Sequence, residues 1–197
     1  MTSFVLVPSP FVGPATWTPT ADELRRRGHD VRDAPSADAV LVGHSGAGPL
    51  LPSLGPATQY LFVDAALPHP GRSRFDVLGP DVETHLRAIG DGESVPPWSE
   101  WFGPGVLDAL VPDAAVRRAI AAELHRIPLS LLTEPLPTVA GWPDAPCAYL
   151  QLSAAYDVEA AEARAMGWPV EVLDGQHLDT AARPVPVADA IERSADG

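Results

Sequence analysis

Short apolar runs, each followed closely by a turn, are the feature of this sequence that most limits its fold. The runs are continuous rather than alternating, which is typical of strands buried on both faces of a parallel sheet. They cover Phe4–Val7, Ala39–Val42, Tyr60–Val63, Ala148–Leu152 and Pro169–Leu173. Segments with helical signals lie between and after them, at Thr18–Arg27, Asp157–Met166 and Val185–Glu192. This alternation predicts an α/β protein with a mostly parallel sheet and helices on both of its faces.

Residues 67–137 differ from the rest of the chain, because they contain many prolines and few apolar runs. Within them, Asp113–Arg126 has an amphipathic pattern in which Val116, Ile120 and Leu124 recur every four residues. We therefore expect a helical lid inserted at about 67–137 into a single domain that spans residues 1–197. A chain of this length is normal for one domain.

The side of the sheet next to the first strand is expected to be reduced. Gly28–Asp33 has the character of a short strand, but only residues 34–38 connect it to the run at Ala39–Val42. A parallel crossover usually needs a dozen or more residues. The spacing thus predicts that Gly28–Asp33 is not a true neighbouring strand.

The charge balance excludes several classes of function. The chain has 13 arginines, no lysine and 26 acidic residues, which gives a net charge of −13. Clustered cations are needed to hold phosphate backbones or anionic lipids, so we expect no nucleic-acid or membrane partner. No secretory signal or membrane span is evident, which favours a cytoplasmic location. Cys147 is the single cysteine, and no Cys/His pattern typical of a zinc site is present, so no metal is expected.

The most informative motif is Gly-His-Ser-Gly-Ala-Gly at residues 43–48. It follows the apolar run Ala39–Val42 and has the form G-x-S-x-A, with Ser45 at its centre. Small residues on both sides of a serine are needed where a strand turns sharply into a helix and exposes the hydroxyl. The start of the following helix also offers free N–H groups to an oxyanion. The motif predicts that Ser45 is a nucleophile.

A histidine in the right place accompanies this serine. His177 follows the last predicted strand after a short Asp174-Gly175-Gln176 turn, and open α/β sheets place their sites at the carboxyl ends of strands. With GHSGAG, the insertion after the next strand and the terminal GQHL, nearly the whole chain resembles the α/β-hydrolase superfamily. VDAALPHPG after the next strand looks like small actinobacterial members of it. The resemblance implies a reduced α/β-hydrolase fold, with Ser45 as nucleophile and His177 as general base and then acid.

The same resemblance leaves two candidates for the acid of the triad. The usual place is the loop after the penultimate strand, where Asp157 lies, and we prefer it although it could equally cap the following helix. The alternative acid is Asp64, at the end of the Tyr60–Val63 run. The oxyanion hole is expected to use the N–H groups of Gly46 and Phe11.

The predicted function is hydrolysis of a small to medium, apolar ester, thioester or lactone through an acyl-enzyme, without a cofactor. Aromatic residues in or near the insertion are expected to line an apolar pocket or to attach the lid to the core, and these are Trp98, Trp101, Phe102 and Trp142. Two alternatives remain because fold does not fix reaction. The first is a lyase, dehydratase or cyclase of specialised biosynthesis, and the second is a ligand-binding member without catalysis.

Overall fold

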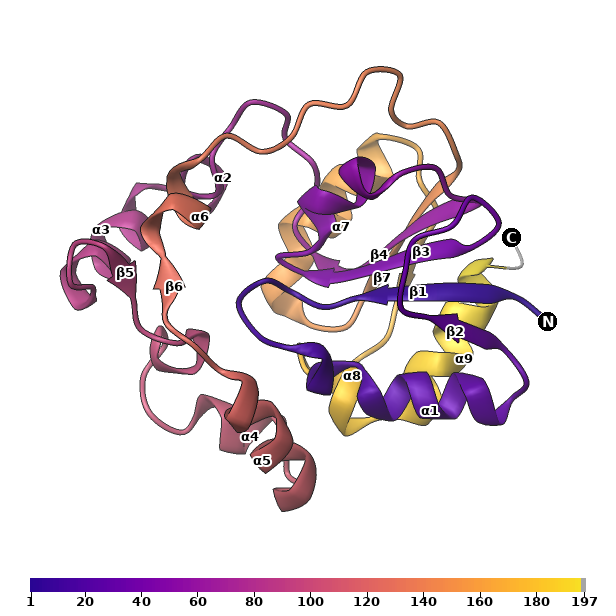
Figure 1. Cartoon of the computed structure of the whole chain (residues 1–197), viewed down its shortest axis with the longest axis horizontal. Coiled ribbons are helices and arrows are strands. Elements are labelled where there is room, and N and C mark those ends of the chain that lie inside the picture. The colour runs from indigo at the N-terminus through magenta and orange to yellow at the C-terminus, as the bar shows by residue number, and fades with distance from the viewer. Residues whose placement is uncertain (196–197) are drawn as a thin grey trace.

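A parallel sheet of six strands forms the centre of the computed structural model, which describes residues 1–195 (Figure 1). The strand order is β2-β1-β3-β4-β7-β8, and every neighbouring pair is parallel. The strands are β1 (Ser3–Val7), β2 (Asp30–Arg32), β3 (Val40–Ser45), β4 (Gln59–Ala65), β7 (Cys147–Gln151) and β8 (Val170–Val172). The α/β class and the parallel sheet predicted from the apolar runs are thus confirmed.

Helices cover both faces of this sheet because successive side chains of each strand point to opposite sides. Val40 and Val42 of β3 pack on the face that α1 (Thr18–Arg26) and α9 (Pro184–Ala195) cover. Leu41 points to the other face, where α7 (Asp157–Ala165) and a 3-10 helix at Gly48–Leu54 pack. Both apolar layers are therefore closed off from solvent, as an all-parallel sheet requires.

The prediction that Gly28–Asp33 is not a neighbouring strand was wrong. Residues Asp30–Arg32 form β2, which pairs in parallel with β1 at the edge of the sheet. Val31 of β2 and Val40 of β3 both pair with Phe4, on opposite sides of β1. The connection from β2 to β3 therefore does not need to run back along the length of the sheet. It crosses one intervening strand, about 10 Å, which seven residues span easily. The short segment between β2 and β3 contains no helix.

The inserted residues form a separate lobe beside the sheet (Figure 1). Its elements are α2 (Arg74–Leu78), α3 (Pro80–Ile89), β5 (Ser94–Val95), α4 (Val106–Leu110), α5 (Ala114–Glu123), β6 (Ile127–Pro128) and α6 (Leu129–Thr133). The antiparallel β5–β6 pair was not predicted, because two-residue strands have no detectable pattern. Lobe residues such as Trp98 and Trp101 share one apolar cluster with Phe11 and Leu178 of the sheet domain. The lobe is thus packed against the loops at one edge of the sheet.

The remaining helical turn is α8 (Asp179–Ala182), which links β8 to α9. Within residues 1–195, none of the helices combines the length and the apolar character that a membrane span needs.

Candidate active site

Ser45 is the last residue of β3 and occupies a sharp turn. Its φ angle is +58°, in the left-handed region that non-glycine residues rarely adopt. The small residues after it are required by close contacts. A Cβ on Gly46 would lie 2.8 Å from Phe11 Cε2, and a Cβ on Gly48 would lie 2.0 Å from the carbonyl oxygen of Ala66. The GHSGAG sequence therefore forms the strained turn that its composition predicted.

His177 is held from one side by a fully buried carboxylate, that of Asp64. The Asp64 Oδ2 atom lies 2.8 Å from His177 Nδ1. The same oxygen accepts a hydrogen bond from Ser153 Oγ at 2.6 Å. Asp64 Oδ1 accepts the backbone N–H groups of Leu152 and Ser153 at 2.8 and 2.9 Å. Asp64 sits at the end of β4 with a φ of +42°, which turns its side chain toward β7 and the His177 loop.

These contacts define the ionisation state of the pair. Burial acts to raise the pKa of Asp64, but hydrogen bonds from His177 and Ser153 outweigh it, so the pKa lies below its usual value. Asp64 therefore remains a carboxylate and accepts the proton on His177 Nδ1. This tautomer leaves His177 Nε2 with a free lone pair, as a general base requires.

The expected pairing of His177 with Asp157 is corrected to a pairing with Asp64. Asp157 is the first residue of α7, and its Oδ1 atom accepts a hydrogen bond from Gln151 Nε2 at 2.5 Å. Its side chain is exposed and is used locally at the start of the helix. Ser153, which holds Asp64, was not singled out from the sequence, because nothing near it marks a serine as a ligand of a distant carboxylate.

The hydroxyl of Ser45 faces a tyrosine that sequence reasoning also missed. Ser45 Oγ lies 3.4 Å from Tyr156 OH, and the Tyr156 ring stacks on His177 with centroids 5.0 Å apart and planes 11° apart. Burial raises the pKa of Tyr156, so its phenol stays protonated. Within residues 1–195, Ser45 and His177 form no hydrogen bond with each other. Hydrogen bonds of this kind are often loose before substrate binds.

His44 packs on the opposite face of His177. It is fully buried, its ring centroid is 4.5 Å from that of His177, and its Nε2 lies 2.9 Å from the His177 carbonyl oxygen. Because a carbonyl only accepts, His44 Nε2 carries the proton and donates it. Burial, together with the neighbouring His177, lowers the pKa of His44 to about 3, so the imidazole is neutral. Besides packing on His177, His44 therefore anchors the His177 backbone.

The two N–H groups expected in the oxyanion hole lie in different environments. Within residues 1–195, the Gly46 N–H has no hydrogen-bond partner and is free to donate to an oxyanion. The Phe11 N–H donates to Ser9 Oγ at 3.3 Å, a long hydrogen bond that an oxyanion could replace. Ser9 is buried, and the sequence did not indicate it.

Ser45 and His177 line a common cavity of about 10 Å³, which is room for about one water molecule. The other lining residues are Ser9, Phe11, Val12, His44, Trp98 and Leu178. An ester therefore fits only if the lobe or the loops move. Of the four aromatic residues singled out, Trp98 lines the cavity and lies 5.9 Å from His177 between ring centroids.

The other three aromatic residues do not reach the cavity. Trp101 packs on Phe11 at 5.2 Å between centroids, and Phe102 is 66% exposed. Trp142 packs against Tyr60 and Trp168 on the α7 side of the sheet. Only Trp98 therefore agrees with the expectation of an aromatic pocket. Across residues 1–195, the metal-binding residue types nowhere gather in groups of three.

Comparison with known proteins supports the fold. No family model matches the sequence, and no curated protein is similar to it in sequence. An extracellular α/β-hydrolase from a Paenibacillus species, which resembles tobacco salicylic acid binding protein 2, superposes with a TM-score of 0.77. It is 19% identical, with 98% of this chain and 99% of that chain covered.

Two further solved structures are similar. A pyrethroid hydrolase from Sphingobium faniae has a TM-score of 0.71 at 14% identity, covering 100% of this chain and 98% of that chain. Tomato methylketone synthase I, bound to 2-tridecanone, has a TM-score of 0.72 at 12% identity, covering 99% and 98%. Identities this low concern the fold alone. Together with the parallel sheet and the strained turn at Ser45, they show that the chain has the α/β-hydrolase fold.

Proposed function

We propose that the protein is a serine hydrolase that cleaves a small to medium ester, thioester or lactone with an apolar body. The observation that carries the proposal is the 2.8 Å contact between His177 Nδ1 and the buried Asp64, beside a cavity that Ser45 and His177 share. This arrangement supports Ser45 as the nucleophile, His177 as the base and Asp64 as the acid that orients it.

The reaction follows from these positions. His177 Nε2 removes the Ser45 hydroxyl proton as Oγ attacks the carbonyl carbon, and the Asp64 carboxylate stabilises the imidazolium that forms. The Gly46 N–H, and the Phe11 N–H once released from Ser9 Oγ, donate to the oxyanion. His177 then protonates the leaving group, and a water activated by the same imidazole hydrolyses the acyl-enzyme.

Tyr156 sets the resting position of the nucleophile. In the free protein its OH group lies near Ser45 Oγ, so the serine must rotate about χ1 to reach His177. A substrate that displaces this contact would lie beside His177, whose ring is close to both Tyr156 and Trp98.

The structural neighbours support a hydrolase without fixing the reaction. Their descriptions include a pyrethroid hydrolase and a polyneuridine aldehyde esterase, but also a methylketone synthase. The test must therefore separate an activated serine from ester turnover.

A fluorophosphonate probe makes that separation. We expect it to label Ser45 in the wild-type protein, and we expect labelling to be lost in Ser45→Ala and in His177→Ala. Ser53→Ala, which changes an exposed serine, is the matched control and should be labelled like the wild type. Absence of labelling in the wild type contradicts the proposal. Labelling without turnover of short p-nitrophenyl esters would instead favour the lyase, dehydratase or cyclase alternative.

A further inference from the structure

Arg74, the first residue of α2, is a buried cation without a carboxylate partner. It is 8% exposed, and its Nη1 donates to the Leu131 carbonyl oxygen in α6 at 2.9 Å. Its Nε and Nη2 atoms have no solvent contact and no hydrogen-bond partner within residues 1–195. A buried charge without a partner is costly, and removing it from water lowers the pKa of Arg74.

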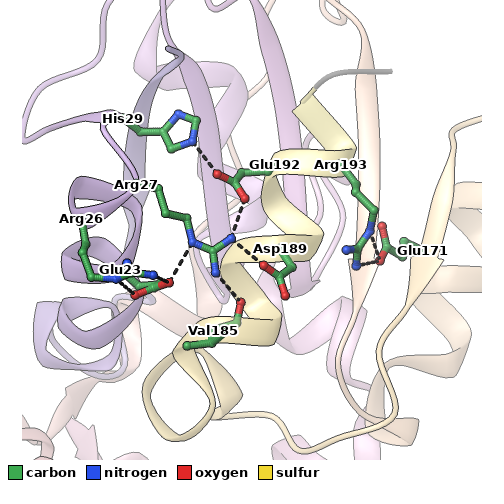
Figure 2. Close-up of polar contacts among 9 residues, drawn as sticks. All are labelled: Glu23, Arg26, Arg27, His29, Glu171, Val185, Asp189, Glu192 and Arg193. Atoms are coloured by element: carbon green, nitrogen blue, oxygen red, sulfur yellow. Dashed lines mark hydrogen bonds and ion pairs between the residues drawn. The ribbon is translucent and has the colours of Figure 1, made fainter.

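In Arg27, by contrast, carboxylates compensate the charge of the guanidinium group. Arg27, at the end of α1, bonds to the carboxylates of Glu23, Asp189 and Glu192 and to the Val185 carbonyl oxygen (Figure 2). Figure 2 shows its nitrogens surrounded by oxygen atoms from two helices. Arg74 is more buried than Arg27, yet its partners are one carbonyl oxygen and the face of the Phe11 ring. The difference lies in the surroundings of the two guanidinium groups.

The nearest acid in sequence does not compensate Arg74. Asp76 lies two residues further along α2, but its Oδ2 atom accepts the backbone N–H and the hydroxyl of Ser73, both at 2.7 Å. The first of these bonds forms the capping box of the helix together with the bond that the Asp76 N–H donates to Ser73 Oγ at 3.1 Å. The Oδ2 atom of Asp76 is therefore occupied, and within residues 1–195 no carboxylate forms an ion pair with Arg74.

The two free nitrogens identify the chemistry of that group. Nε–H and Nη2–H lie on the same edge of the planar guanidinium and point in parallel, which is the arrangement that holds the two oxygens of a carboxylate. Nη1, on the opposite side, is fixed by Leu131 and keeps this edge in place. The free edge therefore fits a planar carboxylate.

The site lies next to the proposed active site. The Arg74 Cζ atom is 5.8 Å from the centroid of the Phe11 ring. The same ring lines the Ser45 cavity and packs over Gly46. Since the cavity holds about one water molecule, binding of an ester requires either the lobe that carries Arg74 or the loops to move. A movement of the lobe would also open the buried edge of the guanidinium.

We infer that Arg74 binds a carboxylate at the far end of the substrate, so that the protein selects esters with an apolar middle and an anionic terminus. The inference rests on the proposed function, because it places the ester carbonyl at Ser45. It names a half-ester of a dicarboxylic acid as the class of substrate. Phe11 would then contact the apolar chain between the two ends.

A binding experiment tests the inference without catalysis. In the Ser45→Ala protein, calorimetry compares monomethyl adipate with methyl hexanoate, which has a methyl group where the half-ester has its carboxylate. Monomethyl succinate, glutarate and suberate, each with its neutral partner, cover other chain lengths. For at least one pair we expect the half-ester to bind at least about tenfold more tightly. We expect Arg74→Gln to abolish this preference and Arg118→Gln, at an exposed arginine, to preserve it.

Equal binding of all pairs overturns the inference, and so does a preference that survives Arg74→Gln. If Arg74→Gln does not fold, Arg74→Met supplies the same comparison. We expect the Tm of Arg74→Met to equal or exceed that of the Ser45→Ala protein, because the substitution removes a buried charge that has no carboxylate partner. A lower Tm with unchanged ester preference would show that Arg74 is structural.

Fluorophosphonate labelling of the wild-type protein separates the two proposals. Labelling of Ser45 without a preference for the half-ester contradicts this inference alone. A preference for the half-ester without labelling contradicts the proposed function alone.

Discussion

The neutral, buried His44 predicts how the stability of this protein depends on pH. In the folded state the pKa of His44 is about 3, whereas a histidine in an unfolded chain has a pKa of about 6.5. Below pH 6.5, His44 therefore binds a proton in the unfolded chain but not in the folded protein. The free energy of unfolding must fall as the pH drops from 6.5 toward 3, and the contribution of His44 is complete above pH 6.5.

The size of this effect follows from the two pKa values. Each pH unit between them corresponds to about 1.4 kcal/mol. Between pH 8 and pH 4.5, protonation of His44 in the unfolded chain should thus reduce the free energy of unfolding by about 3 kcal/mol. This is a large part of the total for a domain whose stability is typically about 5–15 kcal/mol.

The assay is urea unfolding at several pH values between 4.5 and 8, for the wild type and for His44→Gln. The glutamine amide can donate to the His177 carbonyl oxygen as His44 Nε2 does, but it does not titrate. The stability difference between the two proteins should change by about 3 kcal/mol across this range. His125→Gln, at an exposed histidine of the lobe, is the control. A difference between wild type and His44→Gln that is constant with pH would refute the reasoning.

Three other predictions concern single positions. Asp64→Asn should lower kcat/KM for an ester by about 10³-fold or more, because it disturbs the His177 tautomer. The kcat/KM of Asp157→Asn should stay within about threefold of the wild-type value, and ester kinetics can measure both. Gly48→Ala should destabilise the protein by about 2 kcal/mol or more in urea unfolding, since the new Cβ meets the Ala66 carbonyl oxygen; unchanged stability would contradict that contact. Burial raises the pKa of Cys147 to about 12, so iodoacetamide should modify this thiol at pH 8 only after unfolding, a result that mass spectrometry can verify.

Local features of the sequence were enough to predict the turn at Ser45. A buried strand, a serine between small residues and a tight turn are all encoded within residues 39–48. The position of His177 at the same edge of the sheet also followed, because the carboxyl ends of parallel strands meet there. In both cases a few neighbouring residues determine where the side chain lies.

The acid could not be chosen in the same way. Asp64 lies at the carboxyl end of β4 and Asp157 lies in the loop after β7, and these strands are neighbours. The choice depends on the left-handed backbone of Asp64 and on the N–H groups of Leu152 and Ser153, which approach it from β7. Such cross-strand contacts leave no pattern in the sequence of either segment. The prediction for Gly28–Asp33 was wrong for a related reason. The number of residues that a parallel crossover needs depends on the length of the strands that it connects, and β2 has only three residues.

The overall charge of the chain shows that a lack of acidic residues is not why Arg74 has no carboxylate partner. The chain has twice as many acidic residues as arginines, and most of the arginines are in ion pairs, as the contacts of Arg27 illustrate. A shortage of carboxylates cannot explain why a buried guanidinium lacks one. An internal carboxylate would stabilise the free protein but would occupy the edge that a substrate needs. The missing partner is therefore the expected cost of a binding site, and stability and half-ester preference should change in opposite directions when Arg74 is replaced by methionine.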